Sequence, residues 1–294
     1  MTKTVLALGM FDGMHIGHKK IIDTAVLLAK HNGLEPAVFT FSNHPQELFG
    51  GKGKVARLIS NEKRAELMRR LGVKRIEEVE FTREICSMQP AEFVDMLKEK
   101  LDPQIIVAGF NYTFGKGKKG DAELLKKLAL DRGIDVAIVP PVLMNKQPVS
   151  STRIRELIEK GDVSTVQLLL GRAYTLSGTV VEDRRIGRTI GFPTANILPD
   201  PTRAIPADGV YISMAEVDGN IMPSVTNIGT NPTVGGRKRT VETNIFDFET
   251  EIYGQELTVY FVKRLRPVKT FGSLEELKAQ ITKDSAQARR YFNC

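Results

Sequence analysis

Apolar residues follow two different periods along the chain, which divides it near residue 172. In about the first 140 residues, short unbroken apolar runs alternate with segments whose apolar positions recur at helical spacing. The short runs predict strands at residues 4–8, 36–41, 104–108 and 135–139. The helical segments predict helices at residues 19–30, 61–71, 90–101 and 122–131, and residues 149–155 open a further helix that runs to about residue 160. Strands that alternate with helices in this way predict a parallel sheet covered by helices.

Beyond about residue 172, apolar positions alternate with polar ones, which is the period of half-buried strands. Strands are predicted at residues 175–181, 209–217, 222–228, 242–248 and 257–262, between turns rich in Gly, Asn, Asp and Pro. They predict an antiparallel sheet or a closed barrel. A final helix is predicted at residues 274–292, where Ser273 and Glu276 have the spacing of a capping box. We therefore expect two domains, at residues 1–171 and 172–294.

A glycine-rich stretch, Gly9–His18, separates the first predicted strand from the first predicted helix. Such a turn presents free backbone N–H groups and the positive end of the helix dipole to an anion. His15 and His18 stand one helical turn apart there, so both can reach one phosphate. Two alternatives remain open: a metal ion shared by the two histidines, or polar surface residues without a ligand. No further cysteine or histidine has the spacing of an additional metal ligand.

Three loops follow predicted parallel strands and should meet at one edge of the sheet, where ligands of such sheets bind. They are Gly9–His18, Phe41–Pro45 and Gly109–Gly120. The third loop exposes three lysines, at residues 116, 118 and 119, and reads equally well as a solvated loop or as a cationic phosphate lid. Its G-x-G-x-x-G pattern does not follow the first strand, so we do not interpret it as a dinucleotide site.

The helix that residues 149–155 open carries Arg153 and Arg155 in its first turn, where the helix dipole opposes positive charge. Helix capping explains the hydroxyl groups of Ser150 and Ser151. It does not explain the arginines, whereas a bound polyphosphate would, through Arg155 and the free N–H groups.

The second half of the chain contains no histidine, so a general base there would be a carboxylate or, failing that, a lysine. Glu242 stands at the start of a predicted strand and is either this base or an exposed strand residue. Thr194 and Asn196 are two residues apart and could bind a hydrated cation and a phosphate oxygen. Turn chemistry alone could also account for the stretch Gly187–Asn196 that contains them.

Composition narrows the class of protein. No segment approaches the roughly 18 consecutive apolar residues of a membrane helix. Cys86 and Cys294 suggest neither a disulfide framework nor a metal site, and no signal peptide precedes the first strand, so we expect a cytoplasmic protein. The net charge is +7, and residues 172–294 carry 16 basic and 14 acidic residues, which argues against a nucleic-acid partner.

Taken together, these stretches resemble the bacterial bifunctional riboflavin kinase/FMN adenylyltransferase (FAD synthetase) family over nearly the whole chain. The resemblance is carried by residues 9–18, 41–45, 109–115, 150–155, 187–196, 209–211, 227–233, 242–248 and 253–254. It implies a Rossmann-like nucleotidyltransferase domain at residues 1–171, which joins FMN and ATP into FAD and pyrophosphate. It also implies a small antiparallel riboflavin kinase barrel with a C-terminal helix at residues 172–294.

The resemblance implies a role for each matching residue. His15, His18 and Arg155 would act on the phosphates of ATP in the first domain, and Glu242 would be the catalytic base of the kinase. Thr194 and Asn196 would hold Mg²⁺ and an ATP phosphate. The remaining implied binding residues are Gly9, Phe11, Asp12, Gly17, Asn111, Ser151, Thr152 and Arg188. The expected ligands are ATP, Mg²⁺, riboflavin and FMN, and we expect a monomer or a weak homo-oligomer.

Two positions depart from the pattern of the family. Its glycine-containing turn after the first barrel strand is here Glu182–Ile186, whose two acids would repel ATP phosphates. The residue two after the base is commonly His and is here Asn244. These departures leave a monofunctional FMN adenylyltransferase as the alternative, and a flavin-sensing RNA-binding regulator or a flavin-dependent oxidoreductase as further alternatives.

Overall fold

The computed structural model describes residues 2–49, 55–182, 191–233 and 236–294. Its contacts divide the chain into two compact units, residues 1–151 and 152–294. Helices α6 (Ser151–Lys160) and α7 (Val163–Leu170) therefore fall almost wholly in the second unit, where α7 packs against strands of the barrel. The domain boundary expected between residues 171 and 172 stays a prediction.

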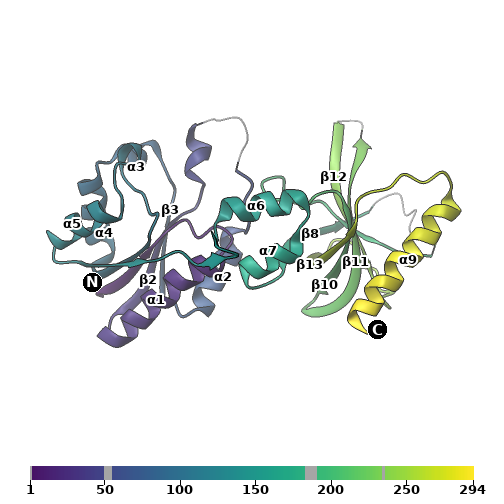
Figure 1. Ribbon diagram of the computed structural model, residues 1–294, viewed down its shortest axis with the longest axis horizontal. Helices are drawn as coiled ribbons and strands as arrows, with labels where there is room; N and C mark the ends of the chain where they lie inside the picture. Colours follow the sequence, from purple (N-terminus) through teal and green to yellow (C-terminus); the bar gives the residue numbers. More distant parts are fainter. Residues whose placement is uncertain (1, 50–54, 183–190, 234–235) are drawn as a thin grey trace. The chain divides into compact units, whose positions relative to one another are not determined.

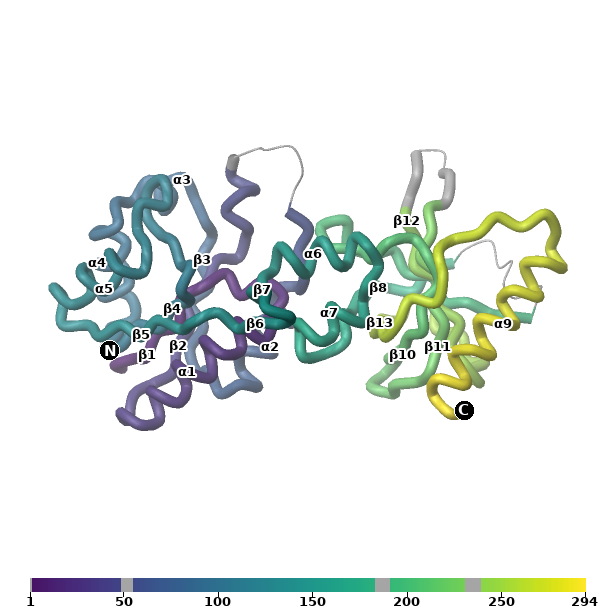
Figure 2. Tube along the Cα trace, viewed as in Figure 1, coloured from purple at the N-terminus to yellow at the C-terminus, as the bar shows by residue number. Residues whose placement is uncertain are grey.

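The first unit is built on a parallel sheet, as the alternating pattern predicts. The strand order is β3-β2-β1-β4-β5, and each neighbouring pair is parallel. Figure 2 follows the chain through this unit, from purple at the N-terminus to teal. The strands are β1 (Thr4–Leu8), β2 (Glu35–Phe41), β3 (Arg75–Val79), β4 (Pro103–Gly109) and β5 (Asp135–Val139). The sequence pattern misses β3, because this edge strand is largely half-exposed and its residues are mostly charged.

Helices cover both faces of this sheet (Figure 1). Leu6 and Leu8 of β1 pack toward α4 (Pro90–Leu101) and α5 (Ala122–Leu130). Val5 and Ala7 pack on the other face, toward α1 (Ile16–Asn32) and α2 (Asn61–Arg70). Since neither face of β1 meets solvent, its sequence is an unbroken apolar run. The smaller elements are η1 (Pro45–Phe49), α3 (Arg83–Ser87), η2 (Lys116–Lys118), β6 (Leu143–Met144) and β7 (Gln147–Pro148).

The second unit contains a closed antiparallel barrel with the strand order β10-β11-β12-β9-β8-β13. The strands are β8 (Tyr174–Val181), β9 (Ala195–Ile197), β10 (Gly209–Val217), β11 (Asn220–Thr233), β12 (Gly236–Ile245) and β13 (Glu256–Arg266). The alternating pattern predicts each of these strands except β9, which has too few residues to show a period. Closure leaves no unpaired edge among the strands that the structure describes.

Helix α9 (Leu274–Phe292) packs against β10 and β11 and spans the residues predicted for it. Val210, Ile212 and Val225 form an apolar cluster with Ala288 of the helix. Arg266 makes an ion pair with the buried carboxylate of Asp284 at 2.7 Å, which fixes the helix on the barrel. None of the helices in the described part of the chain is both long and apolar enough to cross a lipid bilayer.

Candidate active sites

The turn between β1 and α1 follows a left-handed backbone path. Phe11, Gly13 and Met14 have φ angles of 50°, 83° and 44°. Glycine adopts such angles freely, whereas Phe11 and Met14 do not, and both of their side chains are buried. The turn delivers His15 to the N-cap of α1, where its Nδ1 accepts a hydrogen bond from the backbone N–H of His18 at 3.1 Å. The helix therefore begins at Ile16, whereas the apolar spacing predicts a start at Lys19.

The two histidine rings stack on each other, with their centroids 3.6 Å apart and their planes inclined by 16°. Because Nδ1 of His15 accepts a hydrogen bond, the neutral ring carries its proton on Nε2, which can donate to an anion. Nδ1 of His18 is buried and has no hydrogen-bond partner among the described residues. Burial lowers the pKa of His18 well below its usual value, and the nearby charges of His15 and Arg64 lower it further. His18 is therefore neutral in the free protein at neutral pH.

The carboxylate of Asp12 is engaged in holding the turn. Its Oδ1 accepts a hydrogen bond from the backbone N–H of Leu58 at 3.0 Å. The backbone carbonyl of Asp12 accepts a hydrogen bond from the hydroxyl of Ser151 at 2.9 Å. The side chain of Ser151 thus reaches the glycine-rich turn, and its role in binding phosphate stays a prediction.

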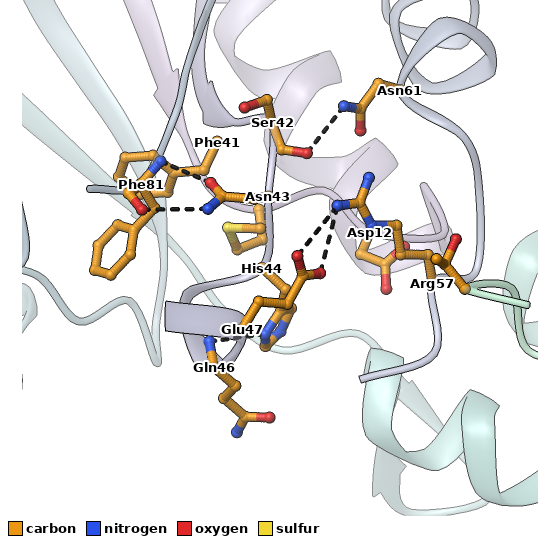
Figure 3. Close-up of polar contacts among 12 residues, drawn as sticks. Asp12, Phe41, Ser42, Asn43, His44, Gln46, Glu47, Arg57, Asn61 and Phe81 are labelled. Carbon is orange, nitrogen blue, oxygen red and sulfur yellow. Dashed lines mark hydrogen bonds and ion pairs between the residues drawn. The ribbon is translucent and has the colours of Figure 1, made fainter. Parts of the chain in front are cut away.

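The loop after β2 is fastened by side-chain hydrogen bonds to neighbouring segments (Figure 3). Asn43 accepts from the N–H of Phe81 at 2.6 Å and donates to the carbonyl of Phe81 at 3.2 Å. Asn61 donates to the carbonyl of Ser42 at 2.9 Å. These contacts fix the loop Phe41–Pro45 beside the turn, since β2 is the neighbour of β1 in the sheet.

The loop after β4 is anchored through its backbone. The N–H of Lys116 donates to the carbonyl of Met88 at 2.7 Å, and Phe114 pairs with Gly120 in an isolated bridge. Asn111 and the three lysines are exposed. Since β4 is the other neighbour of β1, all three loops lie at the carboxyl ends of adjacent strands, as predicted. Whether the lysines form a phosphate lid stays a prediction.

Sequence reasoning missed Arg64 of α2, whose side chain is only 5% exposed. Its guanidinium donates to the carbonyl of Met10 in the glycine-rich turn at 2.9 Å. It also donates to the carbonyl of Phe41 at 2.8 Å and forms an ion pair with Glu78. The sequence does indicate that Arg64 is buried, because it lies at helical spacing from Leu67 and Met68, on the apolar face of α2.

Thr152 and Arg155 lie on α6 in the second compact unit, Thr152 exposed and Arg155 half-buried. They stand three residues apart, so they lie on the same side of that helix. Their role in binding phosphate stays a prediction.

The barrel brings three polar side chains into one row. Asn227 on β11 lies directly opposite Glu242 on β12, and Glu242 lies directly opposite Asn196 on β9. Directly opposed residues share a face of the sheet, so the carboxylate lies between two amides. Oδ1 of Asn196 is buried and has no hydrogen-bond partner among the described residues. Asn227 is a residue that sequence reasoning did not select as part of this site.

Two further contacts order the surroundings of this row. The hydroxyl of Thr240 donates to Oε1 of Glu242 at 3.1 Å. The amide of Asn244 donates to the carbonyl of Pro193 at 2.7 Å, immediately before Thr194. Arg188 and residues 183–186 of the predicted turn lie outside the described residues, and Glu182 is exposed.

Thr194 lines an open pocket of about 200 Å³ in the barrel unit. Thr243 also lines it, and since Thr243 follows Glu242 on β12, the pocket opens on the opposite face of that strand. The segment 248–253 supplies further walls, including the aromatic side chains of Phe248 and Tyr253.

No group of three or more His, Cys, Asp or Glu side chains in the described segments is arranged to hold a metal ion. The stacked pair of His15 and His18 thus has no third ligand of these types within the part of the chain that the structure describes.

Comparison with known protein families matches each unit separately. A model of the FAD synthetase family matches residues 1–153, and a model of the riboflavin kinase family matches residues 170–292.

Curated relatives match nearly the full chain and share the name bifunctional riboflavin kinase/FMN adenylyltransferase. The protein of Bacillus subtilis is 37% identical, over 99% of this chain and 93% of its own. The protein of Listeria monocytogenes is 38% identical, over 98% and 92%, and that of Escherichia coli K12 is 33% identical, over 98% and 92%. A crystal structure from Streptococcus pneumoniae, named a macrolide-efflux protein, has a TM-score of 0.92 at 35% identity, over 98% of this chain and 94% of that one.

Replacing Gly17 by Ala tests whether the orientation of His15 matters for nucleotide binding. A Cβ at this position would lie 3.0 Å from Cε1 and 3.1 Å from Nδ1 of His15, so the ring must move. Alanine favours a helix over glycine by about 1 kcal/mol, so the thermal midpoint should not fall. We expect ATP to bind about tenfold more weakly in titration calorimetry. Thr24→Ala, on the same helix, is the control, and unchanged ATP affinity in Gly17→Ala would contradict the site.

Proposed function

Since the chain belongs to the family of bifunctional riboflavin kinases/FMN adenylyltransferases, we propose that it makes FAD from riboflavin in two ATP-dependent steps. The barrel unit phosphorylates riboflavin to FMN. The parallel-sheet unit then transfers the adenylyl group of ATP to FMN and releases pyrophosphate. The observation that carries this proposal is the stacked histidine pair on a left-handed glycine-rich turn, in one chain with a carboxylate between two amides on a barrel.

Adenylyl transfer needs no nucleophile from the protein. A phosphate oxygen of FMN attacks the α-phosphorus of ATP, a new P–O bond forms, and the bond to the β-phosphate oxygen breaks. The protein contributes alignment and charge neutralisation. Nε2–H of His15 and the N–H groups at the start of α1 donate to the phosphates, and an anion beside His18 favours its protonated form.

The remaining residues of the first site support this arrangement. Gly9, Phe11, Asp12 and Gly17 give the turn its shape, because their backbone and side chains pack within it. Ser151 joins the turn through Asp12, while Asn111, Thr152 and Arg155 are proposed as nucleotide contacts on the resemblance of their positions.

In the kinase site, Glu242 takes the proton from the 5′-hydroxyl of the ribityl chain. The oxygen then attacks the γ-phosphorus of ATP, and ADP leaves. Thr240 donates a hydrogen bond from its hydroxyl to one carboxylate oxygen and so orients the base. The hydroxyl of Thr194 and the buried Oδ1 of Asn196, which has no hydrogen-bond partner among the described residues, are oxygen donors of the type that Mg²⁺ prefers, and we assign the ion to them. When bound, Mg²⁺ neutralises negative charge on the phosphates of ATP.

Asn244 supports an active kinase over a monofunctional adenylyltransferase. Its amide holds the carbonyl of Pro193, so it fixes the backbone that leads into Thr194. We further propose that Arg188 binds phosphate, that the enzyme works in the cytoplasm, and that it is a monomer or a weak homo-oligomer.

Replacing His18 by Ala should reduce FAD formation from FMN by about 10²- to 10³-fold, the usual cost of losing one preorganised charge-stabilising group. Riboflavin phosphorylation should stay within about twofold of the wild type, because the kinase site is in the other unit. Both rates are read from one reaction by chromatography of the flavins. His31→Ala, at the exposed end of α1, is the matched control. Equal loss of both activities in His18→Ala would contradict two separate sites.

Replacing Glu242 by Gln should have the opposite effect on the two activities, so that riboflavin phosphorylation is lost and FAD formation from FMN is kept. Removal of a general base costs about 10²- to 10⁴-fold, so FMN formation from riboflavin should nearly stop. Conversion of added FMN to FAD should continue at the wild-type rate. Glu256→Gln, an exposed carboxylate on β13, controls for charge in the barrel. Normal riboflavin phosphorylation by Glu242→Gln would show that another group is the base.

A further inference from the structure

Arg64 is a buried cation that the proposed mechanism does not use. Its side chain is 5% exposed, although it belongs to a helix whose other arginines, Arg69 and Arg70, are exposed. A guanidinium removed from water is costly unless its donors are matched by acceptors. The groups that accept hydrogen bonds from the guanidinium therefore indicate the role of Arg64.

The acceptors of Arg64 lie in, or just after, three adjacent strands of the sheet. Met10 follows β1, Phe41 ends β2 and Glu78 lies in β3. Two of the three are backbone carbonyl oxygens at the edge where the glycine-rich turn and the loop after β2 meet. The carbonyl of Met10 accepts a second hydrogen bond, from the hydroxyl of Thr40 at 3.2 Å.

The turn needs such support because its backbone is strained. Phe11, the residue after Met10, has φ of 50°, and Met14 has φ of 44°. A residue with a Cβ keeps a left-handed conformation only where its surroundings impose it. Arg64 holds the peptide that enters the strained segment, while Asp12 holds the segment itself through Leu58.

The charge of Arg64 also reaches the histidine pair. It contributes, after burial and after His15, to the low pKa of His18. The groups that act on this ring are His15 from the start of α1 and Arg64 from α2, and Glu78 of β3 partly balances Arg64.

We propose that Arg64 is a positioning residue for adenylyl transfer, which holds the glycine-rich turn in its nucleotide-binding shape through the carbonyl oxygens of Met10 and Phe41. The inference rests on the proposed function, since that function assigns ATP to this turn. The competing explanation is that Arg64 only forms a structural ion pair with Glu78.

Three variants separate these explanations. Arg64→Gln removes the charge and the fork of donors. Glu78→Gln removes the ion pair and leaves both carbonyl contacts of Arg64 in place. Arg70→Gln, which changes an exposed arginine of the same helix, is the matched control. The kcat and the KM for ATP and for FMN are measured in FAD formation, and riboflavin phosphorylation by the same preparation reports the amount of intact protein.

For Arg64→Gln we expect kcat/KM for ATP to fall about 100-fold, the order of loss that follows misplacement of a binding group by about 1 Å. The KM for FMN and riboflavin phosphorylation should stay within about twofold of the wild type, and Glu78→Gln should lose no more than about fivefold. The proposal is overturned if Glu78→Gln loses as much as Arg64→Gln. It is also overturned if the KM for FMN rises as much as that for ATP, or if Arg64→Gln is unimpaired.

Arg64→Lys covers the case in which Arg64→Gln does not fold. Lysine keeps the charge but cannot reproduce the planar fork that reaches two carbonyl oxygens at once. We expect kcat/KM for ATP to fall about tenfold in Arg64→Lys, and an unchanged value would overturn the proposal.

A measurement without substrate separates this inference from the proposed function. The imidazole NMR signals of His15 and His18 report the stacked pair in the free chain. Arg64→Gln should shift them and raise the pKa of His18, because one of the charges that lower it is gone, whereas Arg70→Gln should not. A wild-type chain that makes no FAD would refute the proposed function, and these signals would still test Arg64. Unchanged signals in Arg64→Gln would overturn the positioning role.

Discussion

The left-handed path of the turn between β1 and α1 is the constraint on which the first unit depends. Phe11 and Met14 adopt backbone angles that cost about 1–2 kcal/mol each for residues with a Cβ. Burial of both side chains offsets this cost, and hydrogen bonds to Met10 and Asp12 keep the path fixed. The backbone N–H groups and the histidine pair are thereby arranged before any ligand binds, which is the condition for effective charge stabilisation.

The two proposed sites are built in different ways. The first unit uses the start of a helix and two imidazole rings, which suit an anion. The barrel has no histidine in the described row and uses strand register to place Glu242 between Asn227 and Asn196. Amide and carboxylate oxygens suit a hard cation and a hydroxyl proton, so this row fits a phosphorylation that starts from an alcohol.

Much of the fold follows from the periodicity of the sequence, because both faces of β1 are buried and because the barrel strands alternate. The pattern fails at β3, whose residues are charged and largely half-exposed, and at β9, which is too short to have a period. It also fails at the start of α1, since only the structure shows that Nδ1 of His15 caps the helix. These failures occur where tertiary contacts, and not local preference, decide the conformation.

The candidate sites were predictable where chemistry is concentrated in a short stretch, as in Gly9–His18. They were less predictable where the chemistry depends on distant contacts. Asn227 joins Glu242 only through strand register, and Arg64 reaches Met10 only because α2 packs beneath the turn. Arg64 stands at helical spacing from the apolar residues of α2, and this spacing predicts that its side chain is buried. The spacing does not predict which groups accept its hydrogen bonds.

Incubation of the purified chain with Mg²⁺-ATP and either riboflavin or FMN, followed by chromatography of the flavins, tests the central claim most directly. The account predicts that riboflavin yields FMN and then FAD, and that FMN yields FAD with one pyrophosphate released for each FAD. Conversion of FMN alone would contradict the role given to the barrel, and conversion of neither flavin would contradict the function as a whole.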